Sequence, residues 1–320
     1  MRRCRSSSPV FLGSILILSL LGDVFAFSQE TIPPTPATAS ASTAELAAGA
    51  LERGPWKVAT LRERDGIRNG PEYRGGTIHY PVGASTSLPI MVICPGFQAS
   101  EGSVRPWGGF LASHGIVTMT IGTNRPDVMP IARGRALLDG IETVRAEQDR
   151  EGSPLKGRID GERAGVAGWS MGGGGAQHAA MLDPTLKGVV AMVPWQPLIR
   201  FEHPVPVLIL AGDKDEIAST RKHARPHFDS TPKTTPRLLY EVRGGGHFLP
   251  SSPENHRAQV GAITLAWVKT FVEGDDRYLE VLEERPSTAS IYELELPGVM
   301  DQKSDASEPA GVSTGSGTGR

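Results

Sequence analysis

Short apolar runs alternate with longer amphipathic stretches over most of this chain. The runs are rich in Val, Ile and Leu and are bounded by Gly, Pro or charged residues, a pattern that predicts β-strands. Several are apolar without interruption, which is typical of central parallel strands buried on both faces. The predicted strands are Trp56–Leu61, Gly76–Tyr80, Ile90–Cys94, Ile116–Ile121, Gly165–Gly168, Val189–Val193, Val205–Leu210 and Leu238–Val242.

Longer segments with helical periodicity lie between most of these runs. The alternation of strand and helix predicts an α/β fold, a sandwich with a mostly parallel central sheet. In such sheets the chemistry lies beyond the carboxyl ends of the strands, so candidate residues are those that directly follow each run. The predicted helices are Val104–His114, Ile131–Gln148, Met171–Met181, about Ile217–Phe228, and Asn255–Phe271.

The first 26 residues have the order of a secretory signal peptide. Three arginines precede an uncharged apolar run at 10–21, and Val24-Phe25-Ala26 follows as a candidate cleavage site that ends in a small residue. The run is too short to span a bilayer. Asp23 stands where a lipoprotein would carry its lipidated cysteine. We therefore expect export to the extracellular space or periplasm without a membrane anchor; the alternative is a buried N-terminal helix.

Composition divides the rest of the 320 residues into three parts. Residues 27–53 are rich in Ser, Thr, Ala and Pro and are predicted to be a flexible linker. Residues 301–320 combine Ser, Gly, Thr and acidic residues with almost nothing to bury, and are predicted to be a disordered tail. Residues 54–300 have the length of one large domain.

Charge and cysteine content narrow the class of protein. The net charge is −2, and removal of the signal peptide with its three Arg and one Asp leaves 30 basic and 34 acidic residues. No basic stripe suggests a nucleic-acid partner. The two cysteines are Cys4, which leaves with the signal peptide, and Cys94, in an apolar run. We expect no internal disulfide, and Cys94 is predicted to be a buried small hydrophobe rather than a nucleophile.

The sequence VAGWSMGGGG, which follows the predicted strand at 165–168, surrounds Ser170 with glycines. It contains G-x-S-x-G, in which a serine occupies a strained turn between a strand and a helix. Gly168 and Gly172 would avoid collisions between this turn and neighbouring backbone. The amino end of the next helix would direct free N–H groups and its positive dipole at the reaction centre. Ser170 is therefore the predicted nucleophile; a phosphate-binding loop or a packing turn is the alternative.

Two later strand ends carry an acid and a histidine. Asp215, with Asp213 as the second choice, follows the strand at 205–210 and is predicted to orient an imidazole; either aspartate could instead cap a helix. His247 lies on a glycine-rich loop after the strand at 238–242 and is the predicted base. The order Ser170, Asp215, His247 is that of α/β-hydrolases.

Five other histidines of the domain have structural interpretations. We expect His114 to close a helix, His178 to pack on the helix after Ser170, and His223, His227 and His256 to lie at the surface.

The strand at 90–94 leads into Pro95-Gly96-Phe97-Gln98. In this fold the loop after that strand donates one backbone N–H to the oxyanion, and the residue after the nucleophile donates the other. These donors are predicted to be Phe97 and Met171. Phe97, Trp169 and Trp195 are predicted to line a substrate-binding cleft, with ordinary core packing as the alternative for Trp195.

The segment from Gly168 to Gly175 resembles the corresponding turn of bacterial cutinase-like polyester hydrolases, which include the poly(ethylene terephthalate) hydrolases. The resemblance extends over about Gly54 to Glu295. Supporting matches are Gly54-Pro55-Trp56, Gly75 to Pro81, Pro95-Gly96-Phe97, Leu111 to Gly115, Thr123-Asn124, Ala266 to Lys269, and Asp276-Arg277-Tyr278.

This resemblance implies an α/β-hydrolase without a lid domain that acts on carboxylic esters or polyesters without a cofactor. We expect this chain to be a monomer with no bound metal. It assigns Ser170, Asp215 and His247 to catalysis. Many relatives hold a divalent cation on their acid and histidine loops, but here Arg243 fills one of those positions. We therefore predict an ion pair between Asp213 and Arg243. Alternative functions are a lipase, a short-chain carboxylesterase, a dienelactone-hydrolase-like enzyme, or a binding module without catalysis.

Overall fold

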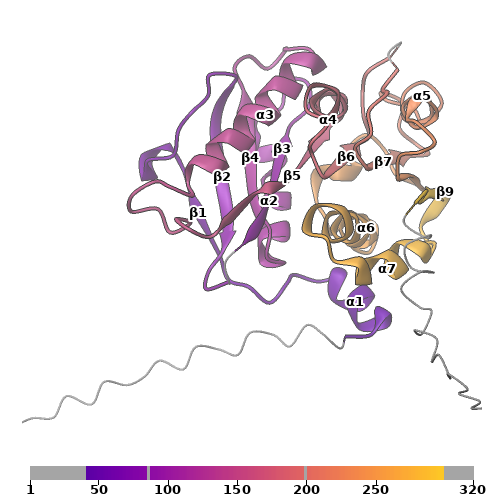
Figure 1. Cartoon of the computed structure of the whole chain (residues 1–320). Coiled ribbons are helices and arrows are strands. Elements are labelled where there is room, and N and C mark those ends of the chain that lie inside the picture. Colours follow the sequence, from indigo (N-terminus) through magenta and orange to yellow (C-terminus); the bar gives the residue numbers. More distant parts are fainter. Residues whose placement is uncertain (1–40, 85–86, 198–199, 299–320) are drawn as a thin grey trace, which may run out of the picture. The chain divides into compact units, whose positions relative to one another are not determined.

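All eight predicted strands occur, and they pair into one sheet with a ninth strand at its edge (Figure 1). A computed structural model describes residues 41–84, 87–197 and 200–298; the predicted signal peptide and the predicted tail lie outside these ranges. The strands are β1 (Val58–Leu61), β2 (Tyr73–Pro81), β3 (Leu88–Cys94), β4 (Val117–Thr123), β5 (Ile159–Trp169), β6 (Gly188–Met192), β7 (Val207–Gly212), β8 (Arg237–Val242) and β9 (Ala289–Glu295).

The sheet is parallel at its centre and antiparallel at both edges. Its order is β1-β2-β4-β3-β5-β6-β7-β8-β9. The pairs from β4 through β3, β5, β6 and β7 to β8 are parallel, whereas β1 with β2, β2 with β4, and β8 with β9 are antiparallel. The segments that follow β3, β5, β6, β7 and β8 therefore emerge at one edge of the sheet. This arrangement confirms the predicted α/β fold with a mostly parallel sheet.

Helices cover both faces of the sheet. Side chains of α3, α4 and α5 belong to one hydrophobic cluster with the strands, and side chains of α2, α6 and α7 belong to the other. The described residues all belong to one compact unit, with no separate lid domain among them. The helices are α1 (Thr43–Ala50), α2 (Arg105–Ser113), α3 (Pro130–Ala146), α4 (Met171–Leu182), α5 (Ala224–Ser230), α6 (Gln259–Val268) and α7 (Leu279–Glu283).

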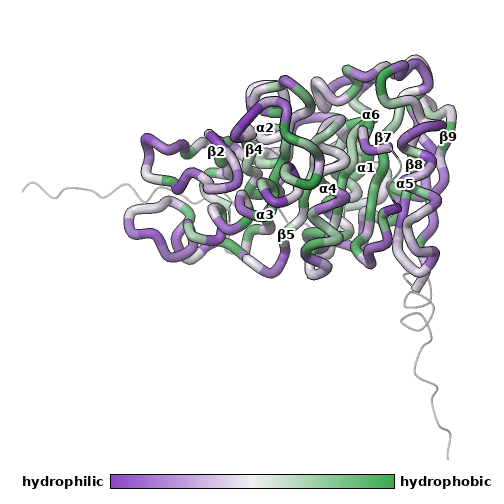
Figure 2. Tube along the Cα trace, turned by 90° about the horizontal axis from the view of Figure 1, so that it is seen from above, coloured by the Kyte–Doolittle hydropathy of each residue, from purple (hydrophilic) through white to green (hydrophobic). Residues whose placement is uncertain are grey.

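Strand β3 illustrates why uninterrupted apolar runs form the centre of the sheet. Successive side chains of a strand point to opposite faces. Ile90, Val92 and Cys94 lie in the cluster with α3 and α4, whereas Met91 and Ile93 lie in the cluster with α2 and α6. Burial raises the pKa of the Cys94 thiol to about 11, in keeping with the predicted inert role. Figure 2 shows hydrophobic segments along the central strands and inner helices, with hydrophilic loops outside.

Several features differ from the sequence prediction, among them α7, which was not predicted, and α6, which begins at Gln259 rather than Asn255. Helix α1 lies within residues 27–53, which were expected to be a linker, and begins with a capping box of Ser42 and Glu45. Strand β9 was not predicted because its glutamates interrupt the apolar pattern; the structure pairs Glu295 with Arg237 of β8. Helix α5 begins later than predicted because Pro226, which has no N–H, fits only the first turn of a helix. No helix in the described ranges is long and apolar enough to cross a membrane.

Buried neutral histidines make the fold sensitive to acid. Burial lowers the pKa values of His79, His203 and His227 to about 4 each. One ring nitrogen of each has no hydrogen-bond partner among the described residues. Because these pKa values lie below the unfolded value of about 6.5, the unfolded chain binds more protons. Their contribution to stability is complete above pH 6.5 and is lost as the pH falls towards 4.

We expect the free energy of unfolding to fall steeply between pH 6.5 and 4, by up to about 3 kcal/mol for His227 alone. Urea unfolding at several pH values measures this slope. His227→Gln keeps a donor for the carbonyl of Gln196, which His227 contacts, and should reduce the slope. The control His256→Gln alters a partly exposed residue and should leave the slope unchanged. An equal slope in wild type and H227Q would contradict this explanation.

Candidate active site

Ser170 lies in the tight turn between β5 and α4, and its backbone is strained. Its φ of 57° and ψ of −117° are unusual for a residue with a side chain. A Cβ on Gly168 would lie 2.1 Å from the carbonyl oxygen of Gly172, and a Cβ on Gly172 would lie 2.3 Å from that of Cys94 on β3. Both glycines are therefore required by close backbone approaches, as the G-x-S-x-G motif predicted.

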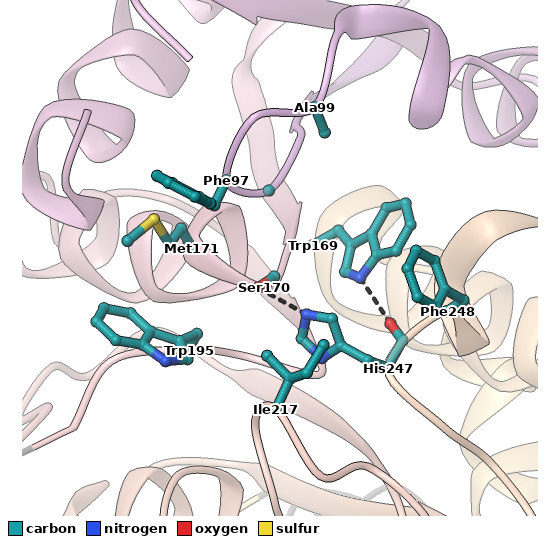
Figure 3. A pocket seen from close by; sticks show the side chains of 10 residues that line it. Phe97, Ala99, Trp169, Ser170, Met171, Trp195, Ile217, His247 and Phe248 are labelled. Carbon is teal, nitrogen blue, oxygen red and sulfur yellow. Dashed lines mark hydrogen bonds between the residues drawn. The ribbon is translucent and has the colours of Figure 1, made fainter. Parts of the chain in front are cut away.

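The three predicted catalytic side chains form one hydrogen-bonded chain. His247 Nε2 lies 2.9 Å from Ser170 Oγ, and His247 Nδ1 lies 2.8 Å from Asp215 Oδ2 (Figure 3 shows the first of these contacts). A carboxylate can only accept, so Nδ1–H donates to Asp215 and Nε2 is left to accept the proton of the serine hydroxyl. Ser170 and Asp215 lie 77 and 32 positions before His247 in the sequence, and these two hydrogen bonds connect all three residues.

Asp215 binds both the histidine and two backbone N–H groups. Its side chain is completely buried. Its Oδ1 accepts hydrogen bonds from the N–H groups of Ile217 and Ala218, at 2.9 and 2.7 Å, while Oδ2 accepts from His247. Of the two interpretations offered by the sequence, the imidazole partner holds for this residue. The helix cap does not, because residues 216–218 form a bend and the next helix, α5, begins only at Ala224. Asp213, the second choice, is exposed and has no hydrogen bond to His247 among the described residues.

The predicted ion pair between Asp213 and Arg243 is wrong. Asp213 Oδ1 accepts a hydrogen bond of 2.7 Å from the N–H of Gly244, and the guanidinium of Arg243 reaches the carbonyl of Ala289 instead. The neighbouring backbone N–H offers the carboxylate a partner without ordering a long exposed side chain. The two loops are still linked, but through the backbone. Within the described ranges no group of three His, Cys, Asp or Glu side chains is placed to hold a metal ion.

The loop after β3 lies against the serine. A Cβ on Gly96 would lie 3.1 Å from the Cβ of Ser170, so the peptide that leads to Phe97 passes directly beside the nucleophile. Met171 is the first residue of α4, where a helical N–H has no acceptor within the helix. The N–H of Phe97 has no acceptor within the described part of the chain. Both predicted oxyanion donors are therefore available next to Ser170.

A pocket of about 430 Å³ opens above Ser170. The sequence identified Phe97, Trp169 and Trp195 in its wall, and all three line it. Figure 3 shows Phe97, Met171 and Trp195 on one side of Ser170 and Trp169 with Phe248 on the other. The full lining is Gly96, Phe97, Ala99, Trp169, Ser170, Met171, Trp195, Ile217, His247 and Phe248.

Ile217 and Phe248 line the pocket but were not predicted to do so. Their exposed fractions of 57% and 68% are large for apolar side chains. Each lies within two positions of a catalytic candidate, Asp215 or His247, and an apolar residue beside a predicted catalytic residue was the signal that could have identified them. An exposed apolar rim of this kind favours contact with an apolar partner or substrate.

Trp169 also supports the histidine. Its indole N–H donates a hydrogen bond of 2.9 Å to the backbone carbonyl of His247 (Figure 3). Its ring meets that of Phe248 edge-on, with 5.6 Å between centroids. The residue beside the nucleophile in sequence is therefore tied to the loop that carries the base.

Two histidines behind Trp195 are buried, so their predicted surface location is wrong. His223 stacks on Trp195 with 5.9 Å between ring centroids, and its Nδ1 accepts from the N–H of Gln196 at 3.3 Å. His227 Nε2 donates to the carbonyl of Gln196 at 2.9 Å. His223 directly precedes α5 and His227 lies on it four residues later, and both bind the loop after β6 at Gln196. His114 and His178 occupy their expected positions, at the end of α2 and on α4.

Comparison with known proteins identifies the family of this chain. The family described as PET hydrolase-like matches residues 31–296. A bis(hydroxyethyl) terephthalate hydrolase of Streptomyces coelicolor is 35% identical over 75% of this chain and 75% of its own length. A cutinase of Thermobifida fusca is 33% identical over 87% of this chain and 88% of its own. Cutinase 2 of Thermobifida cellulosilytica is 34% identical over 76% and 89%, respectively. The chain therefore belongs to the PET hydrolase-like family.

Proposed function

We propose that this protein is an exported, monomeric serine hydrolase that cleaves carboxylic esters, including polyesters, through an acyl-enzyme. The observation that carries the proposal is the chain of hydrogen bonds from Ser170 through His247 to Asp215, beside the N–H groups of Phe97 and Met171, for which the described residues supply no acceptor. Relatives named cutinase and bis(hydroxyethyl) terephthalate hydrolase support the ester as the substrate class.

The proposed reaction begins with attack of Ser170 Oγ on the ester carbonyl carbon. His247 Nε2 takes the hydroxyl proton, and buried Asp215 stabilises the imidazolium that forms. The N–H groups of Phe97 and Met171 would hold the oxyanion, with a contribution of about 3 kcal/mol each.

As the tetrahedral intermediate collapses, the bond between the carbonyl carbon and the alkoxy oxygen breaks. His247 gives its proton to the departing alcohol. In the second half the same imidazole removes a proton from water, whose oxygen attacks the acyl carbon, and then returns that proton to Ser170 as the acid leaves.

The aromatic lining suits an acyl group or repeat unit with a large apolar surface. Trp169 and Trp195 offer ring surfaces on opposite sides of Ser170, and Phe248 extends one wall outward (Figure 3). A dienelactone-hydrolase-like function is less well supported because that group normally uses a cysteine nucleophile, and Cys94 here is buried.

Labelling with a fluorophosphonate probe tests the serine hydrolase proposal. The mature chain should be labelled at one site and should hydrolyse nitrophenyl esters, and an aliphatic polyester emulsion should be cleared. A chain that binds esters but never reacts with the probe would be a binding module. Labelling with turnover of short acyl chains alone would favour the alternative, a short-chain carboxylesterase.

A further inference from the structure

Arg133, on α3, is a completely buried arginine that the proposed mechanism does not use. Its exposed fraction is 0%. The guanidinium donates to three backbone carbonyls, those of Pro95 at 2.9 Å, Pro126 at 2.9 Å and Val128 at 3.0 Å. It therefore connects the loop after β3 with the segment that leads from β4 into α3.

The charge of this guanidinium is not neutralised by a direct partner. No carboxylate within the described residues forms an ion pair with it. Asp127 is exposed and pairs with Arg125, which lowers the pKa of its carboxyl group; the charge of Arg133 adds a smaller effect in the same direction. A buried cation without an ion-pair partner costs free energy, and a neutral side chain could fill the same volume. The buried guanidinium of Arg133 is therefore better explained by a function that needs its charge and its several N–H donors than by packing.

The packing around Arg133 fixes its position. A Cβ on Gly175 of α4 would lie 2.7 Å from the Cβ of Arg133, so the glycine-rich helix after Ser170 makes room for α3 to approach. The carbonyl of Pro126 receives a second hydrogen bond, from the N–H of Gln98 at 2.9 Å. Residues 95–98 are therefore held at both ends: by Arg133 at Pro95 and by Pro126 at Gln98.

The held segment contains the predicted oxyanion donor. Phe97 lies between the two fixed points, and Gly96 touches Ser170. Because the backbone N–H of Phe97 must face the reacting oxygen, a small rotation of this loop would remove one donor from the oxyanion. A fixed positive charge in a site of low dielectric constant also favours negative charge that develops nearby.

We propose that Arg133 is a positioning residue of the ester-cleaving site: it holds the loop of Phe97 against Ser170, and its unneutralised charge stabilises the oxyanion. The inference rests on the proposed function. It assigns to a residue outside the pocket lining a role in the transition state rather than in substrate binding.

Arg133→Met and Arg133→Lys test this role with a soluble nitrophenyl ester. Loss of one oxyanion donor lowers kcat by 10²- to 10³-fold in other serine hydrolases. We expect R133M to lower kcat by about 10²-fold with KM within about threefold of wild type. R133K keeps the charge with fewer hydrogen bonds, should fold even if R133M does not, and should recover part of kcat.

A boronic acid provides a readout that a merely structural role would not change. It adds to Ser170 as a tetrahedral anion, so its affinity should fall in parallel with kcat. Rates are normalised to active sites counted by fluorophosphonate incorporation at completion. The control Arg145→Met, on the same helix, removes a guanidinium that donates to the carbonyl of Gly161 instead. It should leave kcat and boronate affinity unchanged.

Unchanged kcat and boronate affinity per active site in R133K and R133M, with only the melting temperature lowered, would overturn the role of Arg133. Failure of the wild-type chain to react with the fluorophosphonate would instead overturn the proposed function. The two failures are thus distinguishable.

Discussion

Ser170→Ala is expected to lower kcat for ester hydrolysis by about 10⁴- to 10⁶-fold, with KM changed little. The substitution removes only the side-chain hydroxyl of residue 170, and the pocket of about 430 Å³ above it keeps its aromatic walls. Substrate binding should therefore persist while the covalent step is lost. Turnover of a nitrophenyl ester, together with equilibrium binding of a slowly hydrolysed ester analogue, measures both quantities.

The matched control is Ser290→Ala, which removes a serine hydroxyl from β9, where it donates to Glu241. S290A should retain wild-type kcat and probe labelling, whereas S170A should not be labelled. If S170A kept more than a tenth of the wild-type kcat, another nucleophile would be acting and the proposed mechanism would be lost.

The sheet could be predicted because its strands are buried on both faces. A strand such as β3, apolar at every position, is distinguishable from surface segments by composition alone. Strand β9 has a different pattern, with Glu293 and Glu295 paired to arginines of α5 and β8. Those pairs depend on tertiary contacts between segments far apart in the sequence, and no local pattern contains them.

The arrangement of Ser170, Asp215 and His247 was predictable for a related reason. Each follows a parallel strand, and parallel strands end at one edge of the sheet. The surroundings were less predictable. His227 was assigned to the surface, yet the loop after β6 covers it and accepts its hydrogen bond at the carbonyl of Gln196. Gln196 is 31 residues away in the sequence, so no local pattern reveals the burial.

Asp215→Asn should lower kcat by about 10⁴-fold while the fold is retained. Asp215 Oδ1 accepts from two backbone N–H groups, so an asparagine would keep its oxygen there and turn its NH₂ group towards His247 Nδ1. The NH₂ can only donate, which forces the imidazole proton onto Nε2. Nε2 would then face Ser170 as a donor and could no longer accept the hydroxyl proton.

Asp213→Asn is the control, since the sequence alone left both aspartates open. Its side chain is exposed, and the oxygen of an asparagine could still accept from Gly244, so kcat should stay within about twofold and stability within about 1 kcal/mol. Rates of both variants from pH 5 to 9, with melting temperatures, measure the difference. A severe loss in D213N with activity kept in D215N would reverse the assignment of the acid. A loss in D215N alone means that the buried carboxylate acts through the tautomer of His247. That asparagine preserves the volume and the hydrogen bonds from Ile217 and Ala218, and alters only which imidazole nitrogen carries the proton.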